Sequence, residues 1–190
     1  MISIRTTIGN DLDDIIRIHL LSFDKSHFSA NFPPKLLKSY LECLLKSCPF
    51  SFTLLSDNKV AGYIFGGLNP SVGVKDFIRK NLWEVISVFF KYPRFIKEKI
   101  IEILFDKDFK VKNSKEIPTV YIIAADPFVR IGIGIKLINS FEMKIRTENF
   151  FEYRLAVRKD NDKAIKFYER NGFHRLFTSR TSYCYSKSLR

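Results

Sequence analysis

The 190-residue sequence lacks the marks of several large protein classes. The stretch from Met1 to Asp14 has neither a basic start nor an apolar segment of the kind that directs secretion, so a cytoplasmic location is expected. No run approaches the roughly 18 uninterrupted apolar residues of a membrane span, so no transmembrane segment is expected. Internal repeats and low-complexity tracts are also lacking, which favours a single domain over residues 1–190.

Cysteine and histidine are both scarce. The cysteines are Cys43, Cys48 and Cys184, an odd number, and no histidine lies close to the first two in the sequence. Zinc sites need closely spaced cysteine or histidine ligands, and the three histidines fall on separate predicted elements. We therefore expect reduced cysteines that pack in the interior, and no metal site.

Acidic residues are outnumbered by basic ones, because 32 lysines and arginines stand against 20 aspartates and glutamates and give a formal net charge of +12. Nucleic-acid binding is one interpretation of such a surplus. The basic residues, however, are spread over every predicted element and do not form one tract interleaved with stacking aromatic side chains. No nucleic-acid partner is therefore expected, and a positive surplus of this size would equally attract a small polyphosphate ligand.

Alternating apolar patterns and turn residues predict an α+β fold. Pro33 and Pro34 suit the first turn of a helix, and the turn residues Asp57 to Lys59 separate two apolar runs and so predict a β-hairpin. Asn10 or Asp11 can cap the first helix. The expected strands are 2–7, 50–56, 60–67, 120–125, 153–158, 173–179 and 182–188, with helices before the hairpin and after the fourth and fifth strands. This order gives a mostly antiparallel sheet with flanking helices and one parallel βαβ crossover.

Residues 71–115 form an apolar, aromatic and basic insertion before the strand at 120–125. Its spacing predicts one or two helices. Three roles are open for it: a helical pair packed on the sheet, a lid on the substrate side, and a helix that lies on a membrane surface through residues 77–104. Lysines and arginines interrupt the apolar pattern, so the insertion can lie on a bilayer but cannot cross one.

The most informative segment runs from Ala125 to Gly134 and reads Ala-Asp-Pro-Phe-Val-Arg-Ile-Gly-Ile-Gly. An apolar run precedes it and a helical pattern follows, so a glycine-bearing turn joins a strand to the start of a helix. Free N–H groups at a helix N-terminus carry partial positive charge, and glycine lets the main chain approach a diphosphate closely. The turn therefore predicts a phosphate site, although another nucleotide site or a plain strand-to-helix joint would show the same pattern.

A second informative segment covers residues 155–173. Asp160 or Asn161 can cap a helix there, and glycine suits the position that ends it. Within the helix, Asn161, Ala164 and Tyr168 recur at intervals of three to four residues and therefore share a face. A polar side chain, a small residue and a phenol would line a groove beside the preceding strand. The plain alternative is that this helix simply packs onto a sheet.

Together the two segments resemble the GNAT superfamily of N-acetyltransferases, because the glycine turn is followed by Asn-x-x-Ala-x-x-x-Tyr-x-x-x-Gly-Phe within residues 118–175. In that family the turn usually reads Arg/Gln-x-x-Gly-x-Gly/Ala, whereas this chain has Val129 three residues before Gly132 and its arginine at Arg130. The resemblance implies acetyl-CoA as co-substrate, with the turn holding its diphosphate. The cofactor-binding residues that it implies are Ile123, Ala124, Ala125, Arg130, Ile131, Gly132, Ile133, Gly134, Ile135, Asn161, Ala164 and Tyr168.

The resemblance also implies how the acetyl group would move. The strand from Ile123 to Ala125, bulged as in the family, would hold the pantetheine arm and polarise the thioester carbonyl. Tyr168 would be the general acid for the departing thiolate, because a phenol with a pKa of about 10 is protonated at neutral pH. Asp126, next to the turn, is the second catalytic candidate. The general base stays open between water and four carboxylates: Asp126, Glu116, Asp24 and Glu152.

The whole chain is more loosely similar to acetyltransferases found among bacterial surface-polysaccharide genes, through residues Ile18 to Phe23 and the helical insertion. That likeness implies acetyl transfer to the primary amine of a small molecule, of which a nucleotide-linked amino sugar is one example. His27 falls where the acceptor pocket of the family often lies. Transfer to a protein or peptide amine and acyl-CoA binding without catalysis are the alternatives. The sequence fits a monomer and a homodimer equally.

Overall fold

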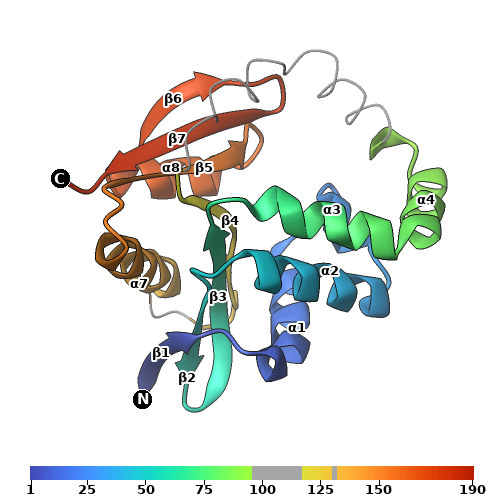
Figure 1. Ribbon diagram of the computed structural model, residues 1–190, viewed down its shortest axis with the longest axis horizontal. Coiled ribbons are helices and arrows are strands. Elements are labelled where there is room, and N and C mark those ends of the chain that lie inside the picture. The colour runs from blue at the N-terminus through green and yellow to red at the C-terminus, as the bar shows by residue number, and fades with distance from the viewer. Residues whose placement is uncertain (96–116, 130–131) are drawn as a thin grey trace.

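The structure is a computed structural model that describes residues 1–95, 117–129 and 132–190, built around a seven-stranded sheet with the order β1-β2-β3-β4-β5-β7-β6 (Figure 1). The strands are β1 (Ile2–Thr6), β2 (Phe52–Ser56), β3 (Lys59–Gly67), β4 (Thr119–Ala125), β5 (Glu152–Arg158), β6 (His174–Thr178) and β7 (Ser182–Ser188). Between them lie the helices α1 (Leu12–Ser22), α2 (Pro34–Ser47), α3 (Pro70–Lys80), α4 (Leu82–Lys91), α7 (Ile133–Thr147) and α8 (Asp162–Arg170), and the short 3-10 turns η1 (Gly9–Asp11) and η2 (Phe28–Asn31). The β4–β5 pair is parallel and the other pairs are antiparallel, which confirms the predicted mixed α+β fold with one crossover.

Helices cover both faces of the sheet. Figure 1 shows α7 on the opposite side of the central strands from α1 and α2. Successive side chains of β3 point to opposite faces, so Tyr63 and Phe65 join a core under α1 and α2, whereas Ile64 joins a second core under α7. This arrangement explains why β3 is buried along most of its length and reads as an almost continuous apolar run.

The predicted hairpin and two of the predicted helix starts are confirmed. Asp57 and Asn58, with φ of 49° and 63°, both lie in the left-handed region, as the tight turn between β2 and β3 requires. Helix α2 begins at Pro34, where the missing N–H costs nothing. Helix α8 is capped by Asn161, whose side-chain oxygen accepts a hydrogen bond of 3.1 Å from the backbone N–H of Ala164.

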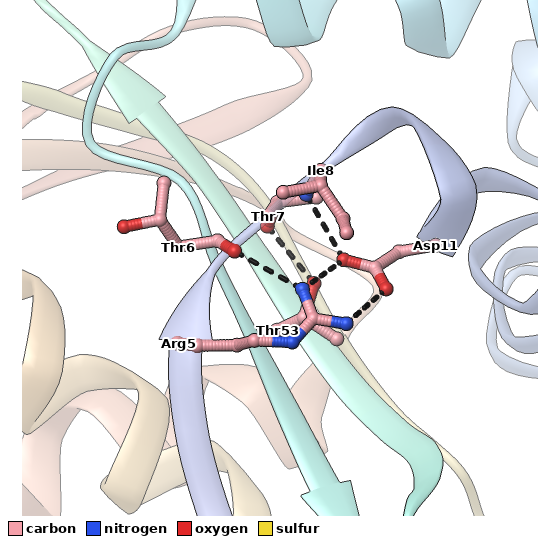
Figure 2. A network of polar contacts seen from close by, with 6 residues as sticks. All are labelled: Arg5, Thr6, Thr7, Ile8, Asp11 and Thr53. Atoms are coloured by element: carbon pink, nitrogen blue, oxygen red, sulfur yellow. Dashed lines mark hydrogen bonds and ion pairs between the residues drawn. The ribbon is translucent and has the colours of Figure 1, made fainter.

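The start of α1 differs from a simple side-chain cap. Asp11 occupies the cap position, but its carboxylate accepts two hydrogen bonds from Arg5, at 2.7 and 2.6 Å, and one from the backbone N–H of Ile8 (Figure 2). Burial would raise the pKa of Asp11, but these hydrogen bonds outweigh it and hold the pKa below its usual value. Thr7 and Thr53 share a further hydrogen bond of 2.9 Å. The network therefore ties β1, β2 and the start of α1 together.

The described part of the insertion is a helical pair, α3 and α4. The predicted pair is thus present, and α3 packs mainly against α2. The two helices approach so closely that a Cβ at Gly73 would lie 2.6 Å from the carbonyl oxygen of Cys43. The remainder of the expected insertion, residues 96–115, lies outside the described residues and includes the last part of the predicted membrane-contact segment, 96–104. Of the helices that are described, none is long and apolar enough to cross a membrane.

Candidate active site

The parallel strands β4 and β5 separate after two residue pairs. They pair only at Thr119 with Arg154 and at Val120 with Leu155, after which β4 stays with β3 and β5 stays with β7. A bulge marks the point of separation, because Phe65 pairs with Ile122 and Gly66 with Val120, which leaves Tyr121 as the extra residue. The bulge was expected at Ile123 to Ala125, so that position was wrong by two residues. Past the bulge, main-chain groups on the β5 side of β4 face an open groove.

The groove between the separated strands has a volume of about 800 Å³. Four of the expected site residues line it together, from β4 and α8: Ile123, Asn161, Ala164 and Tyr168. The loop after α1 forms another wall through Asp24, Ser26 and His27. Ala124 instead packs in the core under α1 and α2. Ala125 packs against the core under α7, and its carbonyl oxygen accepts a hydrogen bond of 3.0 Å from Ser22.

The glycine turn lies at the N-terminus of α7. Gly132 caps the helix in the left-handed conformation, with φ of 62°. Among the described residues, no carbonyl accepts a hydrogen bond from the N–H groups of Ile133, Gly134 and Ile135 in the first helical turn, as is usual at a helix N-terminus, where such groups favour an anion. A Cβ at Gly134 would lie 3.2 Å from the ring of Phe167, so the turn packs against α8, the helix that carries Tyr168, although Gly132, Ile133, Gly134 and Ile135 do not line the groove. Arg130 and Ile131, expected in the same cradle, lie outside the described residues.

The hydroxyl of Tyr168 is available to a ligand. The side chain is only 6% exposed, and its ring packs edge-on against Phe167 and Phe173 at centroid distances of 5.2 and 5.1 Å. Within the described part of the chain the hydroxyl has no hydrogen-bond partner, although the residue lines the groove. Burial raises the pKa of Tyr168, so the phenol stays protonated across the physiological range. The ring is therefore fixed by packing while the O–H is unused by the protein.

Asp126 is an anchor of the turn and does not line the groove. Its carboxylate forms an ion pair of 2.7 Å with Arg17 of α1 and accepts a hydrogen bond of 3.0 Å from the backbone N–H of Phe128. The hydrogen bond from Arg17 lowers the pKa of Asp126 below its usual value. A carboxylate held this way is a weak base, so its geometry argues against the catalytic role expected from the sequence.

The other carboxylates considered as the base are also engaged. Asp24 lines the groove, but its carboxylate accepts hydrogen bonds from Ser26, and these lower its pKa. Glu152 accepts a hydrogen bond of 2.8 Å from Ser186 and lies outside the groove. Glu116 lies outside the described residues.

A second, smaller cavity of about 330 Å³ adjoins the groove, and sequence reasoning missed it. The two hollows share His27, Tyr121 and Arg158, so they are adjacent at these residues. Apolar and aromatic side chains from the η2 segment, α2, α3 and α4 line most of the rest, together with Ser29, Thr181 and Ser182; among the apolar and aromatic ones are Phe32, Tyr40, Phe77, Val85 and Phe89. The aromatic residues of the insertion were visible in the sequence, but nothing in their spacing showed that they would pack directly against Phe28 and Phe32 and line a cavity with them.

Cysteines and metal-binding groups of side chains are not found among the described residues that line the groove. The cysteines are reduced and buried, as expected, and burial raises the pKa of Cys184 to about 11. None of them lines the groove. Among the described residues, no group of three histidines, cysteines or carboxylates is placed to hold a metal ion.

Comparison with known proteins gives one family and one fold. Residues 12–173 match the acetyltransferase (GNAT) family. A search of curated proteins finds no significant match to the sequence. Similar solved structures include PaiA N-acetyltransferase of Thermoplasma acidophilum in complex with coenzyme A, with a TM-score of 0.64, 14% identity and coverage of 99% of both chains.

Two further structures extend the likeness. The polyamine N-acetyltransferase of Drosophila melanogaster, which forms N-acetylagmatine, has a TM-score of 0.62, 11% identity and coverage of 100% of both chains. Ard1 of Thermoplasma volcanium has a TM-score of 0.60 and 18% identity, with coverage of 100% of this chain and 98% of the other. At these identities the structures share the fold, and their own acceptors do not carry over to this chain.

Proposed function

The chain belongs to the acetyltransferase (GNAT) family, and we propose that this acyltransferase moves the acetyl group of acetyl-CoA directly to a primary amine of a small molecule. The observation that supports the proposal most strongly is the groove between β4 and β5, because it is lined by Tyr168, whose hydroxyl has no partner among the described residues, and α8 also contacts the glycine turn through Phe167. Coenzyme A is bound in the similar PaiA structure, which supports acetyl-CoA as the co-substrate.

The groove and the adjacent turn suit two chemically different parts of acetyl-CoA, the diphosphate and the pantetheine arm. The diphosphate would bind to the N–H groups of the first turn of α7, where the helix dipole favours negative charge. The pantetheine arm carries amide groups, and these would pair with the main chain of β4 from Tyr121 to Ile123, where β5 no longer does so. The amide N–H groups of Asn161, which its helix cap does not use, can add a further contact.

Direct transfer is consistent with the side chains that line the groove. The amine nitrogen would attack the thioester carbon, the carbon–sulfur bond would break, and Tyr168 would donate a hydrogen bond or its proton to the departing sulfur. An acyl-enzyme would need an activated nucleophile. The cysteines are buried away from the groove, and the raised pKa of Cys184 keeps that thiol neutral.

The segments that surround His27 favour a small-molecule acceptor over a protein amine. The loop after α1 and the helices α3 and α4 enclose the space beside the groove, so the acceptor side is a cavity. A polypeptide acceptor would need a channel open at both ends. The peripheral membrane contact and the oligomeric state expected from the sequence remain predictions.

The proposal is tested by thiol release from acetyl-CoA with the full-length protein. The acceptor panel contains amino sugars, including a nucleotide-linked one, polyamines, amino acids, peptides and apolar amines. We expect release above hydrolysis with at least one small amine and its acetylated product by mass spectrometry. Coenzyme A binding with no transfer to any amine would instead identify a non-catalytic acyl-CoA-binding module, and transfer to peptides alone would contradict a small-molecule acceptor.

A further inference from the structure

The aromatic cavity next to the groove has no role in binding acetyl-CoA as argued above. It adjoins the groove at His27, Tyr121 and Arg158, so a molecule in it would lie beside the space proposed for the thioester. Its volume of about 330 Å³ lies near the lower end of the range for ligand pockets, roughly 300–1,000 Å³. The cavity is therefore of a size for one compact molecule.

The charges around the cavity limit what that molecule can be. Its lining, as far as the structure describes it, contains no carboxylate, whereas a polyamine would need one for its second ammonium group. Arg158 is the one lysine or arginine among these lining residues, and it is paired with Asp160 at 2.9 and 3.1 Å. A diphosphate would need more free positive charge than this. The lining fits an uncharged, apolar body.

His27 lies at the junction of the two hollows. Its Nδ1 is 2.9 Å from the hydroxyl of Ser29, which is in turn 2.8 Å from Nε2 of His19. The other nitrogen of His19 is 2.7 Å from the hydroxyl of Tyr63. A chain of hydrogen bonds through Ser29 and His19 therefore holds the ring of His27 in place. Its own Nε2 has no hydrogen-bond partner in the part of the chain that is described, and is not sealed from solvent. That nitrogen is available to the amine.

The groups around His27 favour the neutral imidazole. Burial lowers its pKa, and the positive charge of Arg158 lowers it further, against the opposite effect of Asp24. His19 on α1 is also neutral, because burial and, to a smaller extent, the charge of a protonated His27 lower its pKa to about 3. A neutral ring at pH 7 can accept a proton.

Resting on the acetyl transfer proposed above, we propose that the acceptor is a primary amine on an apolar aromatic or alkyl body. That body fills the aromatic cavity, and its nitrogen lies at His27. The imidazole takes one proton from the ammonium group, and the free amine attacks the acetyl carbon. As the carbon–sulfur bond breaks, the nitrogen loses its second proton and the sulfur gains one. An ammonium ion and acetyl-CoA thus yield an amide, the coenzyme A thiol and one proton that His27 returns to water.

The test for the acceptor compares amines with the full-length protein. We expect 2-phenylethylamine and hexylamine to exceed glucosamine and putrescine in kcat/KM by at least about tenfold. From butylamine to hexylamine, each methylene group should raise kcat/KM by about fourfold, the ratio expected for burying one methylene. If putrescine or glucosamine is the better acceptor, the inference is wrong while the acetyltransferase proposal stands. If no amine at all is acetylated, both fail.

The cavity itself is tested by a charge placed at its rim. Ile78 lines the cavity on α3 and is 40% exposed, so Ile78→Asp should fold. We expect this variant to lose tenfold or more in kcat/KM for hexylamine and to gain activity with putrescine, whose second ammonium group would pair with the new carboxylate. Val72→Asp is the matched control, because Val72 is exposed on the same helix and does not line the cavity. Equal effects of the two variants would overturn the assignment.

The role of His27 is tested by its pH profile. His27→Gln keeps a hydrogen-bond partner for Ser29 but cannot take a proton, so kcat at pH 7 should fall about a hundredfold with KM changed little. The wild-type fall in kcat/KM on the acid side of pH 6.5 should also disappear. His174→Gln, on exposed β6, is the control. Full turnover in His27→Gln would remove His27 from the proton transfer.

Discussion

The substitution Tyr168→Phe separates catalysis from stability in this protein, because the hydroxyl that it removes has no partner in the described chain. The ring would keep its edge-on contacts with Phe167 and Phe173, at 5.2 and 5.1 Å. The free energy of unfolding should therefore change by less than about 1 kcal/mol, the value of a typical net hydrogen bond. Acetyl-CoA binding should also be nearly unchanged, since the turn and β4 supply most of its contacts.

Turnover should respond very differently. A single proton-transfer group is worth about ten- to a thousandfold in kcat, which corresponds to roughly 1.4–4 kcal/mol in the activation barrier. Burial raises the pKa of Tyr168, so the phenol is a hydrogen-bond donor throughout the working range and its own ionisation should add no alkaline limb below pH 10. Steady-state thiol release at saturating acetyl-CoA measures the loss in kcat, and urea unfolding measures stability.

Tyr153→Phe is the matched control with the opposite expectation. The hydroxyl of Tyr153 donates a hydrogen bond of 2.6 Å to Glu142, and the residue does not line the groove. Its removal should cost about 1.5–3 kcal/mol of stability, the range for a hydrogen bond to a charged group, with little change in kcat. Unaltered turnover in Tyr168→Phe, or equal losses of turnover in both variants, would refute the role given to Tyr168.

Two further substitutions test the cofactor turn. Gly132→Ala places a side chain at φ of 62° and should lower the free energy of unfolding by about 1–2 kcal/mol. Calorimetry should also show weaker acetyl-CoA binding in this variant. Gly9→Ala, with nothing within 4 Å of the added Cβ, should change neither quantity. Asp126→Asn should lower the free energy of unfolding by about 1 kcal/mol at pH 7, because Arg17 loses its partner. Because the pKa of Asp126 is lower in the folded state, its ionised carboxylate stabilises the fold above pH 3.8, the ordinary pKa of aspartate. This contribution is lost as the pH falls through the pKa of the folded state. The difference in unfolding free energy between variant and wild type, measured with urea, should therefore shrink towards pH 3.

Local signals in the sequence were sufficient for the framework of the fold. The turn at Asp57 and Asn58, the proline start of α2 and the Asn161 cap each rest on chemistry within a few neighbouring residues. The same holds for the face shared by Asn161, Ala164 and Tyr168, since helical spacing alone brings them to one groove. These features were predictable because no distant contact decides them.

The features that the sequence did not predict depend on contacts between residues far apart in the chain. Asp126 looks like a candidate base beside the turn, but Arg17, 109 positions earlier in the chain, makes it a structural ion pair. The bulge falls at Tyr121 because of the register between β3 and β4, which no local pattern encodes. The aromatic cavity likewise arises where α3 and α4 meet the loop after α1. Each depends on contacts between segments that are far apart in the sequence.

The central claim is that the separated strands and the glycine turn hold acetyl-CoA, and calorimetric titration with hydrogen exchange tests it most directly. We expect heat of binding for acetyl-CoA and for coenzyme A, together with slowed exchange of the amides of Gly132 to Ile135 and of Tyr121 to Ile123. Neither ligand should protect the amides of the exposed hairpin turn at Asp57. An absence of heat with unchanged exchange at both segments would contradict the claim, and the assignments to Tyr168 and His27 would fall with it.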